Sequence, residues 1–324
     1  MTNTTSALQP RPFGPTELLV APLCVGCAPL GDMPDVFGYS VAEDAALATL
    51  RAAFSSPINF IDTAASYGDG ESERRIGLVL REHGGLPVGY VLATKADRDA
   101  QTGNFSGEQI KRSVERSLRL LGLERIQIMY IHDPEHTTFE NVMGPGGPLE
   151  VLRRFQDEGV IQHLGISGGP VDMLARYVET GAFAALETHN RYTLLNRSAA
   201  PLLGLAARRG MAVINAAPYG SGMLAKGPDA YARYAYQDAP AEMVERTRRM
   251  AAVCQEYDVP LAAAALQFSL RNPQITSTVV GMSRAERIAQ TLELARHPIP
   301  DEIWPRLDAV GFETDDPEAM RFAK

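Results

Sequence analysis

The sequence predicts a single α/β domain built as a (β/α)₈ TIM barrel. Short apolar runs alternate with longer amphipathic segments, eight such units can be counted, and composition does not change abruptly between them. An open doubly wound sheet usually stops at about five or six strands, so eight units favour closure into a barrel. We assign residues 15–324 to the barrel and the polar residues 1–14 to a flexible N-terminal tail.

The eight expected strands are short apolar runs, each followed by polar or glycine-rich residues. In chain order they are Leu23–Gly26, Ile58–Ile61, Tyr90–Ala93, Ile126–Ile131, Ile161–Ile166, Ala184–Thr188, Ala212–Asn215 and Thr276–Val280.

The expected helices between the strands have apolar residues at three- and four-residue spacing, which is typical of a helix that packs one face on a sheet. They include Ala42–Phe54, Glu71–His83, Gly107–Leu121, Leu149–Glu158, Val171–Thr180 and Ala199–Arg209.

The longest connection, Pro218–Ala241, follows the seventh strand and is rich in Gly, Tyr and Asp. A loop of this length in a compact barrel is usually functional, so we expect a lid. No G-x-G-x-x-G motif follows any expected strand, so a Rossmann dinucleotide-binding fold has no support.

Composition excludes several classes of function. The chain is 45% hydrophobic and 22% charged, as in soluble globular proteins. It has neither a secretory signal nor an apolar run near the roughly 20 residues of a membrane span, so we expect a cytoplasmic protein. A net charge of −8 without a basic strip makes nucleic acid and membrane surfaces poor partners.

The three cysteines argue against a disulfide framework. Cys24 and Cys27 form a C-x-x-C pair, but no second Cys/His pair lies at metal spacing. We therefore expect buried free thiols and no metal site.

Titratable side chains follow three consecutive expected strands. Asp62 and Tyr67 follow the second strand, Lys95 the third, and His132 the fourth. Singly, each has a plain structural explanation: a turn cap, a packed loop aromatic, a solvated charge and a hydrogen-bonded barrel-end histidine. Because active sites of such barrels lie at the carboxyl ends of the strands, the four together predict one site.

The chemistry of this group points to proton transfer. A tyrosine phenol, with an ordinary pKa near ~10, needs help to ionise at neutral pH. The Lys95 ammonium would favour the phenolate of Tyr67, and Asp62 would hold that ammonium in place. His132 would orient the substrate oxygen or share its proton. Without a metal cluster or an activated Ser or Cys, such a group suits hydride transfer, in which a cofactor carries the difficult step.

These residues resemble the aldo-keto reductase superfamily, whose D-x-x-x-x-Y, Lys and His elements appear here as Asp62, Tyr67, Lys95 and His132. Further matching segments are V-G-C-A-P-L-G at 25–31, L-G-I-S at 164–167, N-R-Y-T-L-L at 190–195, A-P-Y-G-S-G-M-L at 217–224 and V-V-G-M-S-R-A-E-R-I at 279–288. Within the superfamily, the sequence is similar to bacterial aldose 1-dehydrogenases, including L-fucose and D-threo-aldose dehydrogenases, and to pyridoxal 4-dehydrogenases.

The resemblance implies NAD or NADP as cofactor and a set of binding residues at the strand ends. Substrate contacts fall on Tyr67, His132 and Asp133. The implied cofactor contacts are Gly26, Cys27, Ala28, Asp62, Ser167, Gly168, His189, Ala216, Pro218, Tyr219, Gly220, Gly222, Gly281, Ser283, Arg284 and Arg287.

Four positions depart from the family pattern. Gly168 replaces the asparagine of a Ser-Asn pair, and His189 lies where many members carry Gln. Ala216 replaces a tyrosine that stacks on the nicotinamide, for which Tyr219 is a possible substitute. Gly281 replaces a lysine of the 2′-phosphate pocket, which favours NAD, although Ser283, Arg284 and Arg287 retain the ability to bind a phosphate.

The function expected from these features is oxidation of a cyclic aldose hemiacetal at C1 to the lactone, with Tyr67 as the base. Asp133, His136 and Glu140 in the loop after the fourth strand suit a hydroxyl-rich substrate, although loop exposure explains the last two. Reduction of an aldehyde and oxidation of pyridoxal are the alternatives on the same chemistry. Two others are a lyase that uses Lys95 as a Schiff base and a cofactor-binding regulatory subunit. We expect a small-molecule substrate, a sugar or aldehyde, and a monomer or small homo-oligomer.

Overall fold

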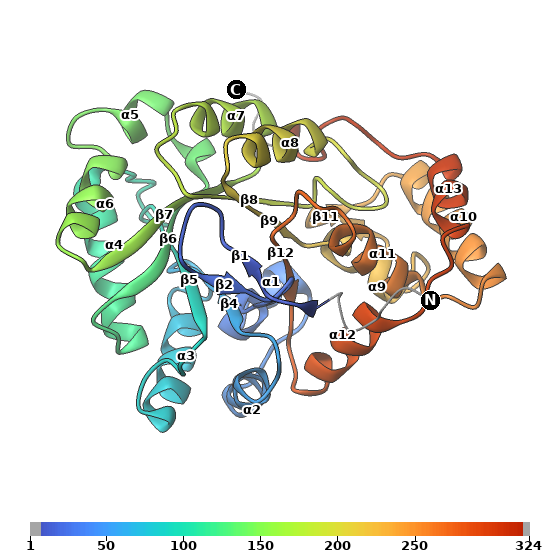
Figure 1. Ribbon diagram of the computed structural model, residues 1–324, viewed down its shortest axis with the longest axis horizontal. Coiled ribbons are helices and arrows are strands. Elements are labelled where there is room, and N and C mark those ends of the chain that lie inside the picture. Colours follow the sequence, from blue (N-terminus) through green and yellow to red (C-terminus); the bar gives the residue numbers. More distant parts are fainter. Residues whose placement is uncertain (1–7, 320–324) are drawn as a thin grey trace.

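The computed structural model describes residues 8–319, which form a closed barrel of parallel strands surrounded by helices (Figure 1). Neighbours around the barrel follow the chain from β3 to β9, and β12 closes it by pairing with both β9 and β3. The predicted fold class is confirmed. The barrel strands are β3 Leu23–Gly26, β4 Phe60–Asp62, β5 Val91–Ala96, β6 Ile126–His132, β7 Ile161–Gly168, β8 Ala185–His189, β9 Ala212–Ala216 and β12 Ser277–Gly281.

Seven of these strands extend one to three residues further at their carboxyl ends than the sequence predicts, counted among the described residues. Asp62 pairs with Ala93 in the ladder, and His132 pairs with Ser167. Polar side chains do not prevent this because the ladder uses only backbone groups. Asp62 and His132 therefore lie on the last rungs of their strands, whereas Tyr67 lies on the loop that follows β4.

The helices cover the outside of the barrel, and the six predicted ones are confirmed to within one residue at each end. Local signals fix these ends: the Ser106 side chain accepts a hydrogen bond from the Gln109 amide at the start of α4, and Gly122 ends α4 in the left-handed conformation at φ 68°. No helix within residues 8–319 is both long and apolar enough to cross a membrane. The helices are α1 Pro34–Phe37, α2 Glu43–Phe54, α3 Glu71–His83, α4 Gly107–Leu121, α5 Phe139–Met143, α6 Pro148–Asp157, α7 Val171–Glu179, α8 Ala200–Arg208, α9 Met223–Lys226, α10 Ala241–Glu256, α11 Leu261–Leu270, α12 Glu286–Arg296 and α13 Ile303–Val310.

An N-terminal hairpin closes the end of the barrel opposite the site. Strands β1 (Arg11–Pro12) and β2 (Leu19–Val20) pair antiparallel and cross the middle of the view in Figure 1. Phe13 beside them is fully buried, and its ring contacts that of Phe60 edge-on, with centroids 5.8 Å apart. The boundary expected at residue 14 is therefore wrong for this part, because apolar contacts hold it against the barrel. The rest of the expected tail, residues 1–7, lies outside the described residues.

The long connection after β9 is folded. It contains a short 3₁₀ helix (Gly220–Gly222), helix α9 and a hairpin of β10 (Arg233–Tyr234) and β11 (Gln237–Asp238). The buried Tyr234 hydroxyl donates to the carbonyl of Asn190 at 2.6 Å, which fastens the hairpin to the barrel. Whether this segment moves as a lid stays a prediction.

Candidate functional site

A cavity of about 1130 Å³ opens at the carboxyl ends of the barrel strands. Its wall comes from the strand ends, the connection after β9, the start of α12 and Glu318 near the C-terminus. Most of the residues predicted from the sequence meet here. They are Gly26, Ala28, Asp62, Tyr67, His132, Asp133, Ser167, His189, Ala216, Pro218, Tyr219, Gly222, Gly281, Ser283, Arg284 and Arg287.

Lys95 lies beneath the cavity and links Asp62 to Tyr67. Its fully buried Nζ donates to Asp62 Oδ1 at 2.5 Å, to the carbonyl of Thr63 at 2.9 Å and to the Tyr67 hydroxyl at 3.3 Å. Inward-pointing positions on neighbouring strands make this possible, since Asp62 ends β4 and Lys95 is on β5. The predicted grouping of these three residues is present in the structure.

The electrostatic balance at this group differs in one respect from the sequence expectation. Burial opposes the charge on Lys95, but Asp62 and then Glu187 more than offset it, so the pKa of Lys95 is raised and it stays an ammonium. Burial also raises the pKa of Tyr67, and the opposing effect of Lys95 does not cancel it. Tyr67 is therefore a neutral phenol at neutral pH, because desolvation of the phenolate costs more than the single ammonium returns.

His132 lies beside Tyr67, with ring centroids 5.9 Å apart, and has two carboxylate neighbours. Its Nδ1 is 2.7 Å from Asp97 Oδ1, and its Nε2 is 3.6 Å from Asp133 Oδ1. Burial opposes protonation, but Asp133 and Asp97 outweigh it and raise the pKa of His132 to about 9. His132 is an imidazolium at neutral pH and can donate a hydrogen bond to a substrate oxygen.

Asp97 is a functional residue that the sequence analysis missed. Besides binding His132, its Oδ2 accepts a hydrogen bond from the Ser66 amide at 2.8 Å, next to Tyr67. It therefore fixes the histidine and the tyrosine segment together. Its signal is its place in T-K-A-D, two residues after Lys95 and so on the same side of an extended chain.

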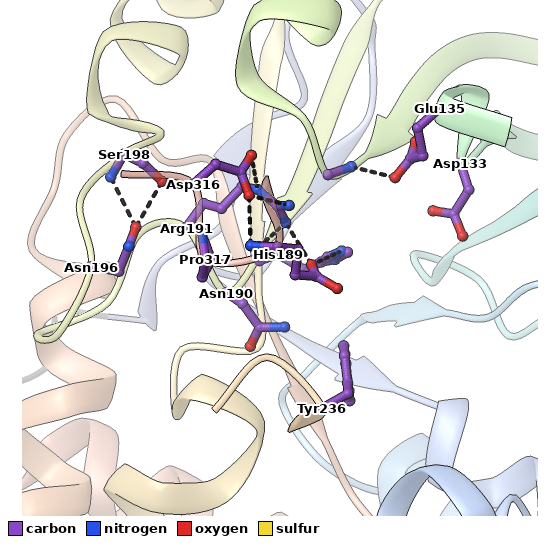
Figure 2. Close-up of polar contacts among 12 residues, drawn as sticks. Asp133, Glu135, His189, Asn190, Arg191, Asn196, Ser198, Tyr236, Asp316 and Pro317 are labelled. Carbon is purple, nitrogen blue, oxygen red and sulfur yellow. Dashed lines mark hydrogen bonds and ion pairs between the residues drawn. The ribbon is translucent and has the colours of Figure 1, made fainter. Parts of the chain in front are cut away.

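Three residues expected to contact a cofactor do not line the cavity. The Cys27 side chain packs in the apolar cluster between barrel and helices. Gly168 is covered by Glu135, since a Cβ there would lie 2.7 Å from Glu135 Oε2, and the Gly169 amide donates to Glu135 Oε1 at 3.0 Å (Figure 2). Gly220 allows a turn at φ 56° against the Tyr234 ring.

The outer end of the cavity is basic. Arg284, just before α12, and Arg287, in its first turn, line this end together with Lys226 of α9, which was not predicted from the sequence. Burial and the nearby Arg287 lower the pKa of Lys226, which places the two cations close together. Acidic side chains instead collect at the inner end. This separation fits an elongated ligand whose anionic part lies outward, as in a nicotinamide dinucleotide.

Ala216 ends β9 and lines the cavity wall. Tyr219 also lines the cavity, and its buried hydroxyl has no hydrogen-bond partner in the described chain. A buried donor of this kind suits a bound polar group. Stacking of Tyr219 on a nicotinamide stays a prediction.

The wall that faces the proton-transfer group is polar and comes from distant parts of the chain (Figure 2). His189 of β8 lies 3.8 Å, Nε2 to Oε2, from Glu318, and its ring centroid is 6.2 Å from that of Tyr236. Burial and then Arg191 lower the pKa of His189 to about 4, so its ring is neutral. Asp133 faces the same space.

Arg191 holds the C-terminal segment in place. This fully buried guanidinium donates to both carboxylate oxygens of Asp316, at 3.0 and 2.8 Å, and to Glu318 Oε2 at 3.0 Å. The dashed lines in Figure 2 converge on it. No sequence signal joins residues 191 and 318, because the contact depends on the path of the chain after α13.

Left-handed backbone at residues other than glycine is concentrated around the cavity. Asp133, Ala217, Ser221, Ala235 and Tyr236 all line it and have φ between 46° and 64°. Such conformations cost about 1–3 kcal/mol each and persist where the surroundings impose them, most often at functional sites. The strain supports the cavity as the site, independently of its charges.

The comparisons with known proteins agree with this geometry. The model of the Aldo/keto reductase family matches residues 22–311. The chain is 33% identical to the D-threo-aldose 1-dehydrogenase of a Pseudomonas species, with 90% of this chain and 94% of that protein covered. It is 31% identical to the pyridoxal 4-dehydrogenase of Microbacterium luteolum (94% and 98% covered) and 30% identical to the L-galactose dehydrogenase of Arabidopsis thaliana (93% of each). The aldo-keto reductase AKR11C1 of Bacillus halodurans, in its holo form, matches with a TM-score of 0.77 and 23% identity over 97% of this chain and 99% of that one, which supports the fold.

Proposed function

Because the chain belongs to the aldo/keto reductase family of oxidoreductases, we propose that it oxidises a cyclic hemiacetal, most simply an aldose at C1, to the lactone with NAD or NADP. The observation that carries the proposal is the division of one cavity into three parts. A phenol backed by an ammonium lies at the bottom, a polar wall faces it, and a basic end lies outward. These parts match the proton, the hydroxyl groups and the phosphates that such a reaction must handle.

The proton-transfer group acts on the C1 hydroxyl. Tyr67 accepts the hydroxyl proton as the C1–O bond becomes a carbonyl and the C1 hydrogen leaves with its electron pair. When bound, the nicotinamide ring supplies the position that accepts this hydride. His132 donates a hydrogen bond to the C1 oxygen, and Lys95 stabilises the ionised form of Tyr67 that takes up the proton. In aldehyde reduction the same residues act in reverse.

The polar wall supports a substrate with several hydroxyl groups. The neutral His189 offers both a donor and an acceptor, and Asp133 and Glu318 offer acceptors. Pyridoxal is the second candidate, since it also forms a cyclic hemiacetal and its ring nitrogen, when protonated, suits the same carboxylates. The similarity of the chain to a pyridoxal 4-dehydrogenase supports pyridoxal as a candidate substrate.

For the cofactor, the described residues that fit the phosphates are Ser283, Arg284, Arg287 and Lys226 at the outer end. Gly281 gives no cation there, which favours NAD, while the extra Lys226 partly compensates for it. Gly26, Ala28, Pro218 and Gly222 provide a wall of small residues and backbone along the way, and we expect Ser167, His189, Ala216 and Tyr219 around the nicotinamide.

The structure argues against the Schiff-base alternative. A nucleophilic lysine must be neutral and reachable, whereas Lys95 is a fully buried ammonium bound to Asp62. A purely regulatory role would leave the complete proton-transfer group without a use.

The test is a panel of aldoses, pyridoxal and simple aldehydes assayed with NAD and NADP, following reduced nicotinamide by absorbance. We expect turnover with at least one aldose that has a free C1 hydroxyl and none with its methyl glycoside. Turnover of pyridoxal alone would favour the second candidate, and reduction of aldehydes without sugar oxidation would contradict the proposal.

A further inference from the structure

Glu187 is a buried carboxyl in the wall of the cavity that was not among the residues predicted from the sequence. It is the middle residue of β8 and points into the barrel between Ala185 and His189, where it is 5% exposed. Its Oε1 lies 3.4 Å from Lys95 Nζ. Lys95 therefore has two carboxyl groups beside it, Asp62 and Glu187, from strands on different sides of the barrel.

The two carboxyl groups both lie next to the Lys95 ammonium, and the charge of Asp62 raises the pKa of Glu187. Asp62 Oδ2 and Glu187 Oε2 are both buried and have no hydrogen-bond partner elsewhere in the described chain. Two carboxylate oxygens repel each other, so burial of the two groups around one ammonium favours a protonated Glu187.

We propose that Glu187 is a positioning residue for proton transfer, which carries a proton beside Asp62 so that a single negative charge, not two, neutralises Lys95. The inference rests on the proposed function in that Tyr67 is the acid–base group on which the charge acts. It adds a residue outside the four that the sequence predicts.

The charges around Glu187 give the direction of its effect. Burial and then Asp62 raise the pKa of Glu187 to about 8 against the opposing Lys95 and His132. A second negative charge here would stabilise Lys95 but raise the pKa of Tyr67 further. The titratable groups that face Glu187 are Cys24 on β3, Asp62 on β4, Tyr67 after β4, Lys95 on β5, and Tyr130 and His132 on β6.

The consequence is that ionised Glu187 limits the rate of oxidation at alkaline pH. Oxidation speeds up with pH as Tyr67 ionises, but above about pH 8 the ionised Glu187 makes that ionisation harder. Below about pH 8 the proton on Glu187 keeps the extra charge absent, and the side chain is electrically equivalent to glutamine.

The Glu187→Gln variant tests this because it mimics the protonated form. Between pH 6 and 7 its turnover number for oxidation should match that of the unchanged enzyme within about twofold. Near pH 9.5 it should exceed it by about 3- to 10-fold, since one pKa unit on Tyr67 is a tenfold change in phenolate. Glu187→Asp keeps a titrating carboxyl, so its rate of oxidation should remain limited at alkaline pH as in the unchanged enzyme. An equal loss at all pH values in Glu187→Gln would reveal a merely structural role and overturn the inference.

Infrared difference spectroscopy provides a readout that does not need turnover. A protonated carboxyl band should be present at pH 7, disappear as pH rises through about 8, and be missing in Glu187→Gln. Glu73→Gln is the matched control: Glu73 is a fully buried carboxyl on α3 whose pKa is raised to about 7, and it bonds Thr94 outside the cavity. It should lose its own band and leave the pH profile of oxidation unchanged. If no sugar, pyridoxal or aldehyde is turned over, the proposed function fails, while absence of a Glu187-dependent band separately refutes the protonated state of Glu187.

Discussion

The two inner walls of the cavity are built in different ways. The proton-transfer wall comes from three neighbouring strands, β4 to β6, and its charged residues lie within residues 62–133. The facing wall joins β8, the hairpin after β9 and the C-terminal segment, and the buried cation Arg191 binds Asp316 and Glu318 of that segment. The first wall has barrel geometry as its support, whereas the second depends on contacts between distant loops. We therefore expect chemistry to be robust on one side and substrate preference to be adjustable on the other.

The largest expected effect is on the proton-transfer wall. Tyr67→Phe removes the acid–base group but leaves the ring and the basic end of the cavity, so nucleotide affinity should stay within about twofold. Turnover should fall by about 10²–10⁴-fold. Steady-state kinetics measure the turnover, and a fluorescence titration measures the nucleotide affinity. Full activity in the variant would show that the wall with Tyr67 does not carry the proton transfer.

The next effect is on the facing wall. Arg191→Met leaves Asp316 and the buried Glu318 without their cation, which should lower the free energy of unfolding by about 3–5 kcal/mol. KM for the substrate should rise more than KM for the nucleotide, because the C-terminal segment lines the substrate side. The matched control is Arg51→Met, which breaks an exposed pair with Glu82 and should cost less than ~1 kcal/mol. Equal losses of unfolding free energy in the two variants, measured by urea unfolding, would show that Arg191 does not stabilise the C-terminal segment.

A smaller effect concerns the partner of His132. The raised pKa, about 9 against an ordinary value near ~6.5, means that His132 stabilises the fold fully below about pH 6.5, and this contribution is lost as pH rises through about 9. Asp97→Asn should lower the pKa of His132 and shrink that pH-dependent part of the stability. NMR titration of the imidazole and urea unfolding between pH 6 and 10 check both points. An unchanged titration would show that Asp133 alone sets the charge.

The smallest effect tests the basic end. Gly281→Lys adds a cation at a position where a Cβ would first meet a side-chain atom, Pro29 Cγ, at 3.3 Å. An exposed charge pair of this kind contributes about 0.2–1 kcal/mol, so the preference for NADP over NAD should improve by up to about fivefold. No change in the ratio of kcat/KM values would mean that the 2′-phosphate lies elsewhere.

The fold and the proton-transfer wall were predictable because both follow from periodicity along the chain. Asp62, Lys95 and His132 each lie at the carboxyl end of a buried strand, and parallel strands bring such ends together. Sequence could equally have pointed to Asp97 and Glu187, since each lies two residues from a predicted site residue in extended chain, Asp97 directly after β5 and Glu187 on β8. A single carboxylate at such a position is a weak signal.

The facing wall was not predictable to the same degree. His189 was found through its strand, but Tyr236 and Glu318 reach the cavity through loop conformations and a tether to Arg191 that no local pattern encodes. The charge state of Tyr67 could not be predicted from the sequence either. It depends on the effect of burial on the pKa of Tyr67, which is larger than the opposing effect of the Lys95 ammonium. Gly168 was misplaced for a similar reason, since the Glu135 side chain from the preceding loop covers it.

The most direct test of the central claim uses an aldose substrate labelled with deuterium at C1. If C1 donates a hydride while Tyr67 takes up the hydroxyl proton, the deuterium must appear on the reduced nicotinamide, and the labelled carbon must become the lactone carbonyl. We predict complete transfer of the label in the unchanged enzyme and none in Tyr67→Phe on the same timescale. Reduced nicotinamide without deuterium, formed from the labelled sugar, would contradict the account.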